Sequence, residues 1–172
     1  MTLELIEWSD ELAFRVFEDL DFQDRMEAAI WRGDDASPLA LWADWRLWGG
    51  WRAVTRVACW REGRNMSPFA VLGLQPSGPR GVMQGALLAR NHALYRRPLL
   101  HLARGLRAEL PDRAAEWGLT RIEARSWTEH PTAGRLLTAV GFRLEAPELA
   151  GMPGSFAQYA WTLEPGGEPA CA

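Results

Sequence analysis

Near residue 52 the hydrophobic periodicity changes from the helical value of about 3.6 residues to two, and this change constrains the fold most. Three segments after this point have the alternating pattern or the short apolar runs that are typical of strands, at 52–60, 68–75 and 82–90. The two segments between them, 61–65 and 76–81, are rich in Gly, Pro, Asn or Ser and are predicted to be turns. Because short turns join antiparallel neighbours, the pattern predicts a meander.

A helix is predicted after this meander, followed by another strand. Pro98 begins the helix, and Leu99, Leu102, Leu106 and Leu110 recur on one of its faces. Pro111 is expected to break the helix, with a short helical piece running on to Trp117. Residues 119–127 then have a strand pattern. A strand, a helix and a strand in this order predict a right-handed crossover between parallel strands 82–90 and 119–127.

The remaining patterns predict helices on both faces of a mixed, mostly antiparallel twisted sheet of about six or seven strands, an α/β (α+β) class. The expected strands are 2–8, 142–145 and 155–163, and the expected helices are 10–20, 21–32, 37–48 and 132–140. In the helix at 21–32, Phe22, Met26 and Ile30 are expected to form the apolar stripe. We expect one domain over residues 1–163 and a frayed tail over 164–172.

Four tryptophans recur at a spacing of three residues: Trp42, Trp45, Trp48 and Trp51. This spacing places the helical ones on a wide aromatic face. Packing against the sheet is the favoured interpretation. An acceptor pocket, a homo-oligomer contact or a partner-protein surface over Trp42–Trp51 is the alternative.

Composition excludes several chemistries and partners. The chain has no lysine, so it forms no Schiff base with pyridoxal phosphate and has no phosphate-loop lysine. A net charge of −3 argues against nucleic acid or an anionic membrane as partner. Two distant cysteines and three scattered histidines give no zinc spacing, so we expect no metal and no close Cys/His cluster. With no apolar run of membrane length, a cytoplasmic location is expected.

One motif resembles a known family. Residues 130–142, His-Pro-Thr-Ala-Gly-Arg-Leu-Leu-Thr-Ala-Val-Gly-Phe, match the helix and strand start of the GCN5-related N-acetyltransferase (GNAT) family at Ala133, Leu136, Gly141 and Phe142. The strand before it, Arg121-Ile122-Glu123-Ala124, is also similar, and the order of elements fits from about residue 50 to 163. Segments 25–28, 37–41, 70–74 and 90–106 further resemble divergent phage and prophage GNAT-like proteins.

The resemblance implies an acetyltransferase that seats the pantetheine of acetyl-CoA between strands 82–90 and 119–127. The residues implied to bind this cosubstrate are Leu88, Ala89, Arg90, Arg96, Arg97, Leu99, Leu100 and His101. Two departures weaken the match. The glycines of the pyrophosphate loop are absent and Pro98 lacks an amide donor. Leu137 stands where many members have a tyrosine that protonates the leaving thiolate.

The resemblance implies transfer of an acetyl group from acetyl-CoA to an unidentified amine. Glu123, Glu129 and His130 are the candidate general bases by position, and no spacing distinguishes among them. Because of the two departures, whether the protein is an enzyme stays open. The alternative function is a non-catalytic GNAT-fold protein of phage or prophage origin, structural or partner-binding, which would place it in a virion.

Overall fold

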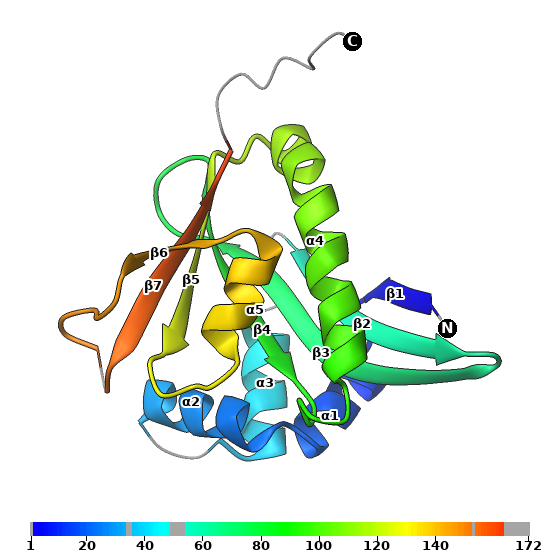
Figure 1. Ribbon diagram of the computed structural model, residues 1–172. Helices are drawn as coiled ribbons and strands as arrows, with labels where there is room; N and C mark the ends of the chain where they lie inside the picture. The colour runs from blue at the N-terminus through cyan, green and yellow to red at the C-terminus, as the bar shows by residue number, and fades with distance from the viewer. Residues whose placement is uncertain (1, 34–35, 49–53, 153, 164–172) are drawn as a thin grey trace, which may run out of the picture.

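The computed structural model describes residues 2–33, 36–48, 54–152 and 154–163 (Figure 1). The elements follow in the predicted order: β1 (Thr2–Glu7), α1 (Asp10–Glu18), α2 (Phe22–Arg32), α3 (Pro38–Trp48), β2 (Val54–Glu62), β3 (Asn65–Pro76), β4 (Val82–Ala89), α4 (Arg96–Trp117), β5 (Arg121–Trp127), α5 (Ala133–Val140), β6 (Arg143–Ala146) and β7 (Phe156–Thr162).

The strands form one seven-stranded sheet in the order β1-β2-β3-β4-β5-β7-β6. Among the described strands, β4 and β5 are the one parallel pair, and every other pairing is antiparallel. The predicted mixed, mostly antiparallel sheet is therefore confirmed. The parallel pairing of β4 with β5 runs from Val82 opposite Arg121 only as far as Gly85 opposite Ala124. Beyond these residues the two strands are no longer paired.

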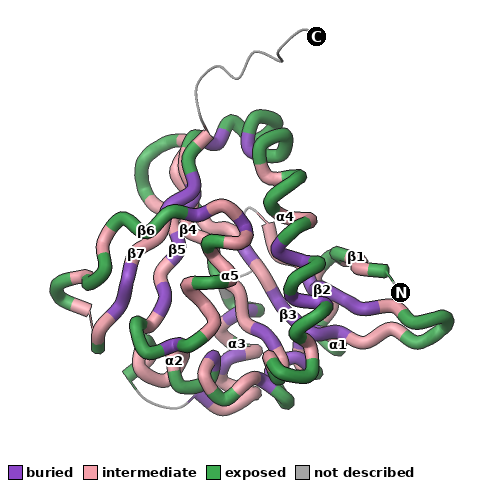
Figure 2. The backbone as a smooth tube through the Cα atoms, viewed as in Figure 1, coloured by how far each residue is buried: buried purple, intermediate pink, exposed green. Residues whose placement is uncertain are grey.

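Helices cover both faces of the sheet, as predicted: α1 and α3 lie on one face, α4 and α5 on the other (Figure 1). Alternate residues of β2 pack against the helices on opposite faces of the sheet. Val57 and Cys59 are fully buried with α1 and α3, whereas Ala58 and Trp60 are buried with α4. The buried segments of the tube in Figure 2 accordingly follow the central strands. This period of two is what a sheet covered on both sides requires.

Helix α4 continues through Pro111, so the predicted break there is wrong. Proline removes one amide donor, which leaves the carbonyl one turn earlier without its helical partner. Pro111 is exposed, so water can hydrate that carbonyl, and the buried Ala114 keeps the following turn packed on the sheet. Gly118 ends the helix at a φ of 66°. Among the described residues, neither α4 nor another helix has both the length and the apolar character needed to cross a membrane.

The tryptophan-rich helix α3 contributes to the core. Trp45 is 6% exposed, stacks on Trp8 at 6.3 Å between ring centres and touches Phe17. Trp42 is half-buried, with its ring edge-on to Phe14. These contacts favour the packing interpretation for the first two tryptophans. The Trp48 side chain and Trp51 lie outside the described residues.

Gly141 provides a test of the motif that carries the family resemblance. It ends α5 at a φ of 112°, where its amide donates to the carbonyls of Leu137 and Thr138. Because a β-branched residue is strained at this φ, Gly141→Val should lower the free energy of unfolding by about 1–3 kcal/mol in urea denaturation. Gly105→Ala, inside α4 with only an ordinary contact to Leu3, is the control and should not destabilise. Equal stability of both variants would contradict the assignment.

Candidate functional site

The N-terminus of α2 lies against the end of β4, where β4 has already separated from β5. The amide of Asp21 donates to the Ala89 carbonyl at 2.9 Å, and the Ala89 amide donates to Oδ2 of Asp24 at 2.6 Å. Asp21, the N-cap of α2, and Asp24, in its first turn, thus satisfy both backbone groups of Ala89, as a neighbouring strand would. This contact fixes α2 beside the opening between the two strands.

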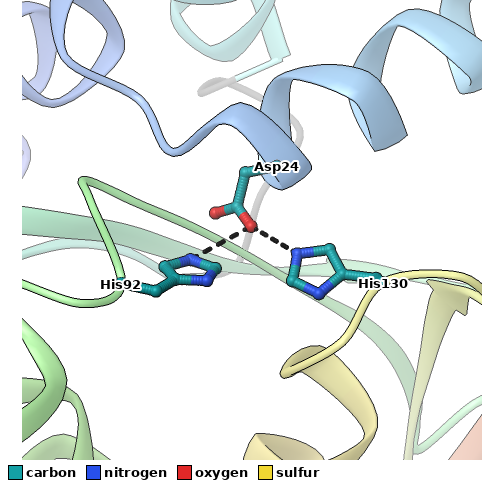
Figure 3. Close-up of side chains that lie close together, drawn as sticks. All are labelled: Asp24, His92 and His130. Atoms are coloured by element: carbon teal, nitrogen blue, oxygen red, sulfur yellow. Dashed lines mark hydrogen bonds and ion pairs between the residues drawn. The ribbon is translucent and has the colours of Figure 1, made fainter.

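Asp24 is the centre of a buried cluster with two histidines (Figure 3). Its side chain comes from α2, His92 from the loop before α4, and His130 from the loop before α5. Oδ1 of Asp24 lies 2.8 Å from Nε2 of His130 and 3.2 Å from Nε2 of His92. Asp24 and His130 are each 6% exposed. The sequence-based expectation that the histidines form no close cluster is therefore wrong.

The hydrogen bonds of His130 fix its tautomer. Its Nδ1 accepts the amides of Ala133 at 3.0 Å and Thr132 at 3.3 Å, at the start of α5. Because Nδ1 accepts, Nε2 must carry the hydrogen that is donated to Asp24. Two histidines and a carboxylate are a common metal-ligand set. A metal, however, would need the Nε2 lone pair of His130, so this arrangement suits a hydrogen-bonded cluster and does not fit a metal centre.

Opposite charges stabilise the ionised forms of Asp24 and His92. Burial alone would raise the pKa of Asp24, but hydrogen bonds from His130, His92 and the Ala89 amide bring it below its ordinary value. Burial alone would lower the pKa of His92, but the hydrogen bond and charge of Asp24, with the charge of Asp21, raise it above its ordinary value. Nδ1 of His92 also contacts Oγ1 of Thr132 at 2.9 Å.

Glu27, one turn after Asp24 on α2, is the residue best suited to accept a proton. Burial raises its pKa to about 7, and the nearby charge of Asp24 adds to the effect. A hydrogen bond from the backbone of Trp127 opposes this rise. Glu27 therefore lies beside the end of β5 and keeps part of its surface exposed. A general base works best with a pKa near the operating pH.

The three sequence-predicted candidate bases lie in different surroundings. Glu123 is ion-paired with Arg121 at 2.9 Å, and Arg121 also binds Glu145. Glu129 is exposed on the loop before α5. His130 belongs to the Asp24 cluster, where both ring nitrogens are hydrogen-bonded. Of the three, only His130 is placed with the cluster beside the strand opening.

The residues predicted to bind a pyrophosphate are only partly brought together. Arg96 and Arg97 are exposed in the first turn of α4, and its N-cap has no side-chain hydrogen bond. The amide of Leu99 already donates to the Tyr95 carbonyl, and both Pro98 and Leu99 are buried. In the first turn of α4, the groups that remain for binding a pyrophosphate are therefore the side chains and amides of Arg96 and Arg97.

The other predicted cosubstrate residues have protein partners or different positions. Arg90 binds Asp19 at 2.7 Å and the Pro68 carbonyl at 3.0 Å. His101 packs on Trp60 with 5.2 Å between ring centres, away from the first turn. Leu88 packs against the core beneath α1, and Leu100 is 43% exposed on α4.

The predicted apolar stripe of α2 is also wrong, and the error explains why Glu27 was missed. Phe22 is 68% exposed and Met26 37% exposed, whereas Asp24 is buried. Ala28 and Ala29 pack against the core, and beside them Asp24 and Glu27 turn inward because their carboxylates meet donors at the strand ends. The only signal in the sequence for an inward-facing pair of carboxylates is the i, i+3 spacing of Asp24 and Glu27, which puts both on one face of α2.

Comparisons with known proteins identify the fold. No protein-family model matches the sequence, and no curated protein matches it. A GNAT-family acetyltransferase from Bacillus anthracis has a TM-score of 0.69 at 15% identity, over 95% of this chain and 96% of its own. A Bacillus subtilis acetyltransferase in complex with CoA has a TM-score of 0.59 at 14% identity, over 94% of this chain and 98% of its own.

A third structure, yncA from Salmonella typhimurium, is described as a candidate acetyltransferase with its cofactor acetyl-CoA. Its TM-score is 0.61 at 13% identity, and the match covers 99% of this chain and 100% of the yncA chain. The chain therefore has the fold of GNAT acetyltransferases along nearly its whole length. The predicted resemblance is confirmed for the fold.

Removing the central carboxylate should destabilise the protein strongly. Asp24→Ala leaves the His92 and His130 donors and the Ala89 amide without their acceptor. Breaking a buried charge pair in this way costs about 3–5 kcal/mol, so urea denaturation at pH 7 should show a loss of that size. Asp112→Ala, which removes an exposed carboxylate from α4, is the control and should change stability by less than about 0.5 kcal/mol. Similar stabilities for the two variants would contradict the role of Asp24.

The raised pKa of Glu27 should make the fold less stable as pH rises. The unfolded chain releases this proton near pH 4.5, whereas the folded protein keeps it until about pH 7. Between these values the wild type should lose about 1.4 kcal/mol per pH unit relative to Glu27→Gln. The variant should equal the wild type near pH 4.5 and exceed it by about 3 kcal/mol at pH 8. If the difference in unfolding free energy between the wild type and Glu27→Gln stayed constant from pH 4.5 to pH 8, the raised pKa of Glu27 would be contradicted.

Proposed function

We propose that the protein transfers an acetyl group from acetyl-CoA to an amine, with Glu27 as the general base. One observation supports this above all others. Strands β4 and β5 pair in parallel as far as Gly85 and Ala124 and then separate beside the partly exposed Glu27. The separated strands leave backbone groups for an extended cosubstrate arm, and the GNAT fold of the chain agrees with this use.

The chemistry needs one proton acceptor at this opening. An amine with a free lone pair attacks the thioester carbonyl, the carbon–sulfur bond breaks, and the CoA thiolate leaves. Glu27 takes the proton that the ammonium group must lose before its lone pair is free. The second proton, which the nitrogen loses as the amide forms, passes through water to the thiolate. With a pKa of about 7, Glu27 is ionised in a useful fraction of molecules at neutral pH and is still basic.

Two features shape how acetyl-CoA would bind. The exposed Arg96 and Arg97 at the start of α4 suit the pyrophosphate, through charge-assisted hydrogen bonds and the helix dipole. The Ala89 amide already donates to Asp24, so the pantetheine arm must use β4 groups that precede Ala89. The sequence-predicted role of Ala89 in binding the cosubstrate can therefore use its amide only if Asp24 moves.

Calorimetric titration with acetyl-CoA tests binding. The wild type should bind saturably, and changing Arg96 and Arg97 together to Ala should weaken binding by roughly tenfold or more for each charge-assisted hydrogen bond lost. Changing Arg104 and Arg107 to Ala removes the same charge from exposed positions further along α4 and is the control. No binding at millimolar acetyl-CoA would overturn the proposal and favour a non-catalytic GNAT-fold protein.

Turnover tests the base. The dependence of kcat/KM on pH should rise through a pKa of about 7. Glu27→Gln should lower kcat by about 10²–10⁴-fold, the usual contribution of general-base catalysis. Glu109→Gln, an exposed change on α4, should leave the rate unaltered. If the Glu27 variant kept full activity with the same pH profile, another group would have to be the base.

A further inference from the structure

Helix α2 and strand β5 contact each other at two neighbouring positions, and Glu27 takes part in the first of them. The backbone of Trp127 hydrogen-bonds Glu27 near the end of β5. One helical turn later, the Trp31 ring lies under the guanidinium of Arg125, 5.7 Å from ring centre to carbon. Arg125 precedes Trp127 by two residues, so both side chains leave the same face of β5. Glu27 and Arg125 therefore lie at neighbouring positions along the contact between α2 and β5.

Among the described residues, the guanidinium of Arg125 contacts the face of the Trp31 ring and no carboxylate. Its Nε is buried without a hydrogen-bond partner, and in the described part of the chain the side chain makes no hydrogen bond or ion pair. The nearest acidic residue on the same face of β5, Glu123, is held by Arg121 instead. A buried donor without an acceptor is costly, so such a group commonly has a partner that the protein chain does not supply.

An apolar surface accompanies this cation. The Trp31 side chain is 48% exposed although it packs edge-on against Phe156 at 5.9 Å between ring centres. Half of a large ring is therefore open to a neighbour. A base, an unpaired cation and an exposed aromatic ring lie along a single helix–strand contact, which is the arrangement that a small zwitterion with an apolar part requires.

We propose that Arg125 binds a carboxylate of the acceptor, so that the acceptor is an amino acid or a closely related amine carrying a carboxylate. This inference rests on the proposed function for the role of its amine, which faces Glu27. A rise of about 6 Å over four helical residues and about 6.7 Å over two strand residues sets the scale of the separation. That scale suits an ammonium and a carboxylate joined by a short carbon chain, with apolar atoms against Trp31.

Binding measured without acetyl-CoA tests this inference separately from catalysis. The probes are the twenty common L-amino acids, β-alanine and 4-aminobutyrate, each compared with its carboxamide by thermal shift and calorimetry. At least one amino acid should bind the wild type about tenfold or more tightly than its carboxamide, because the amide cannot form the charge-assisted pair. This comparison needs no variant, so it stands even if a substitution at Arg125 disturbs folding.

Variants then locate the effect. Arg125→Gln should abolish the preference for carboxylate over carboxamide, and Arg125→Lys should retain part of it, since charge remains but the planar fork is lost. Arg135→Gln, an exposed arginine of α5, is the control and should keep the full preference. Absence of any carboxylate preference in the panel, or its persistence in Arg125→Gln, would overturn the inference. Carboxylate binding without acetyl-CoA binding would uphold it and instead contradict the proposed acetyl transfer.

Discussion

A carboxylate is tolerated inside a protein only when its charge is paired and its oxygens accept hydrogen bonds, and the region around the strand opening depends on Asp24 meeting this condition. It receives hydrogen bonds from the Ala89 amide and the His130 ring, and it pairs with His92. These partners belong to β4 and to the loops that precede α4 and α5. One buried charge therefore holds α2, β4, α4 and α5 in register where β4 and β5 separate.

The same arrangement gives Glu27 its properties. By tying the start of α2 to β4, Asp24 brings the next turn of the helix to the end of β5, where Glu27 loses solvent and its pKa rises to about 7. An ionisable group buried this way destabilises the fold at neutral pH. A protein keeps such a group where function needs it, which is why Glu27 is a better candidate base than Glu123, whose charge is neutralised by Arg121.

The order of elements was predictable because each depends on local signals: the change of period near residue 52, Gly118 after a helix, Gly141 before a strand. The site was not, because its members meet only in the folded chain; Asp24 and His130 are 106 positions apart. In α2, Asp24 is buried and Phe22 is exposed, against the usual rule that apolar side chains are buried, because the Ala89 amide and two histidines compensate the carboxylate. Pro111 was misjudged because exposure lets water replace the lost helical bond.

The protonation of Glu27 is the property on which the functional account depends, and carboxyl-carbon NMR of protein labelled at glutamate measures it directly. A titration from pH 4 to 9, assigned with Glu27→Gln, should show Glu27 changing protonation near pH 7. The same carboxyl group in the urea-unfolded chain should change protonation near pH 4.5. A Glu27 resonance that titrates at the same pH in the folded and the unfolded chain would contradict its burial beside the end of β5 and its role as the base.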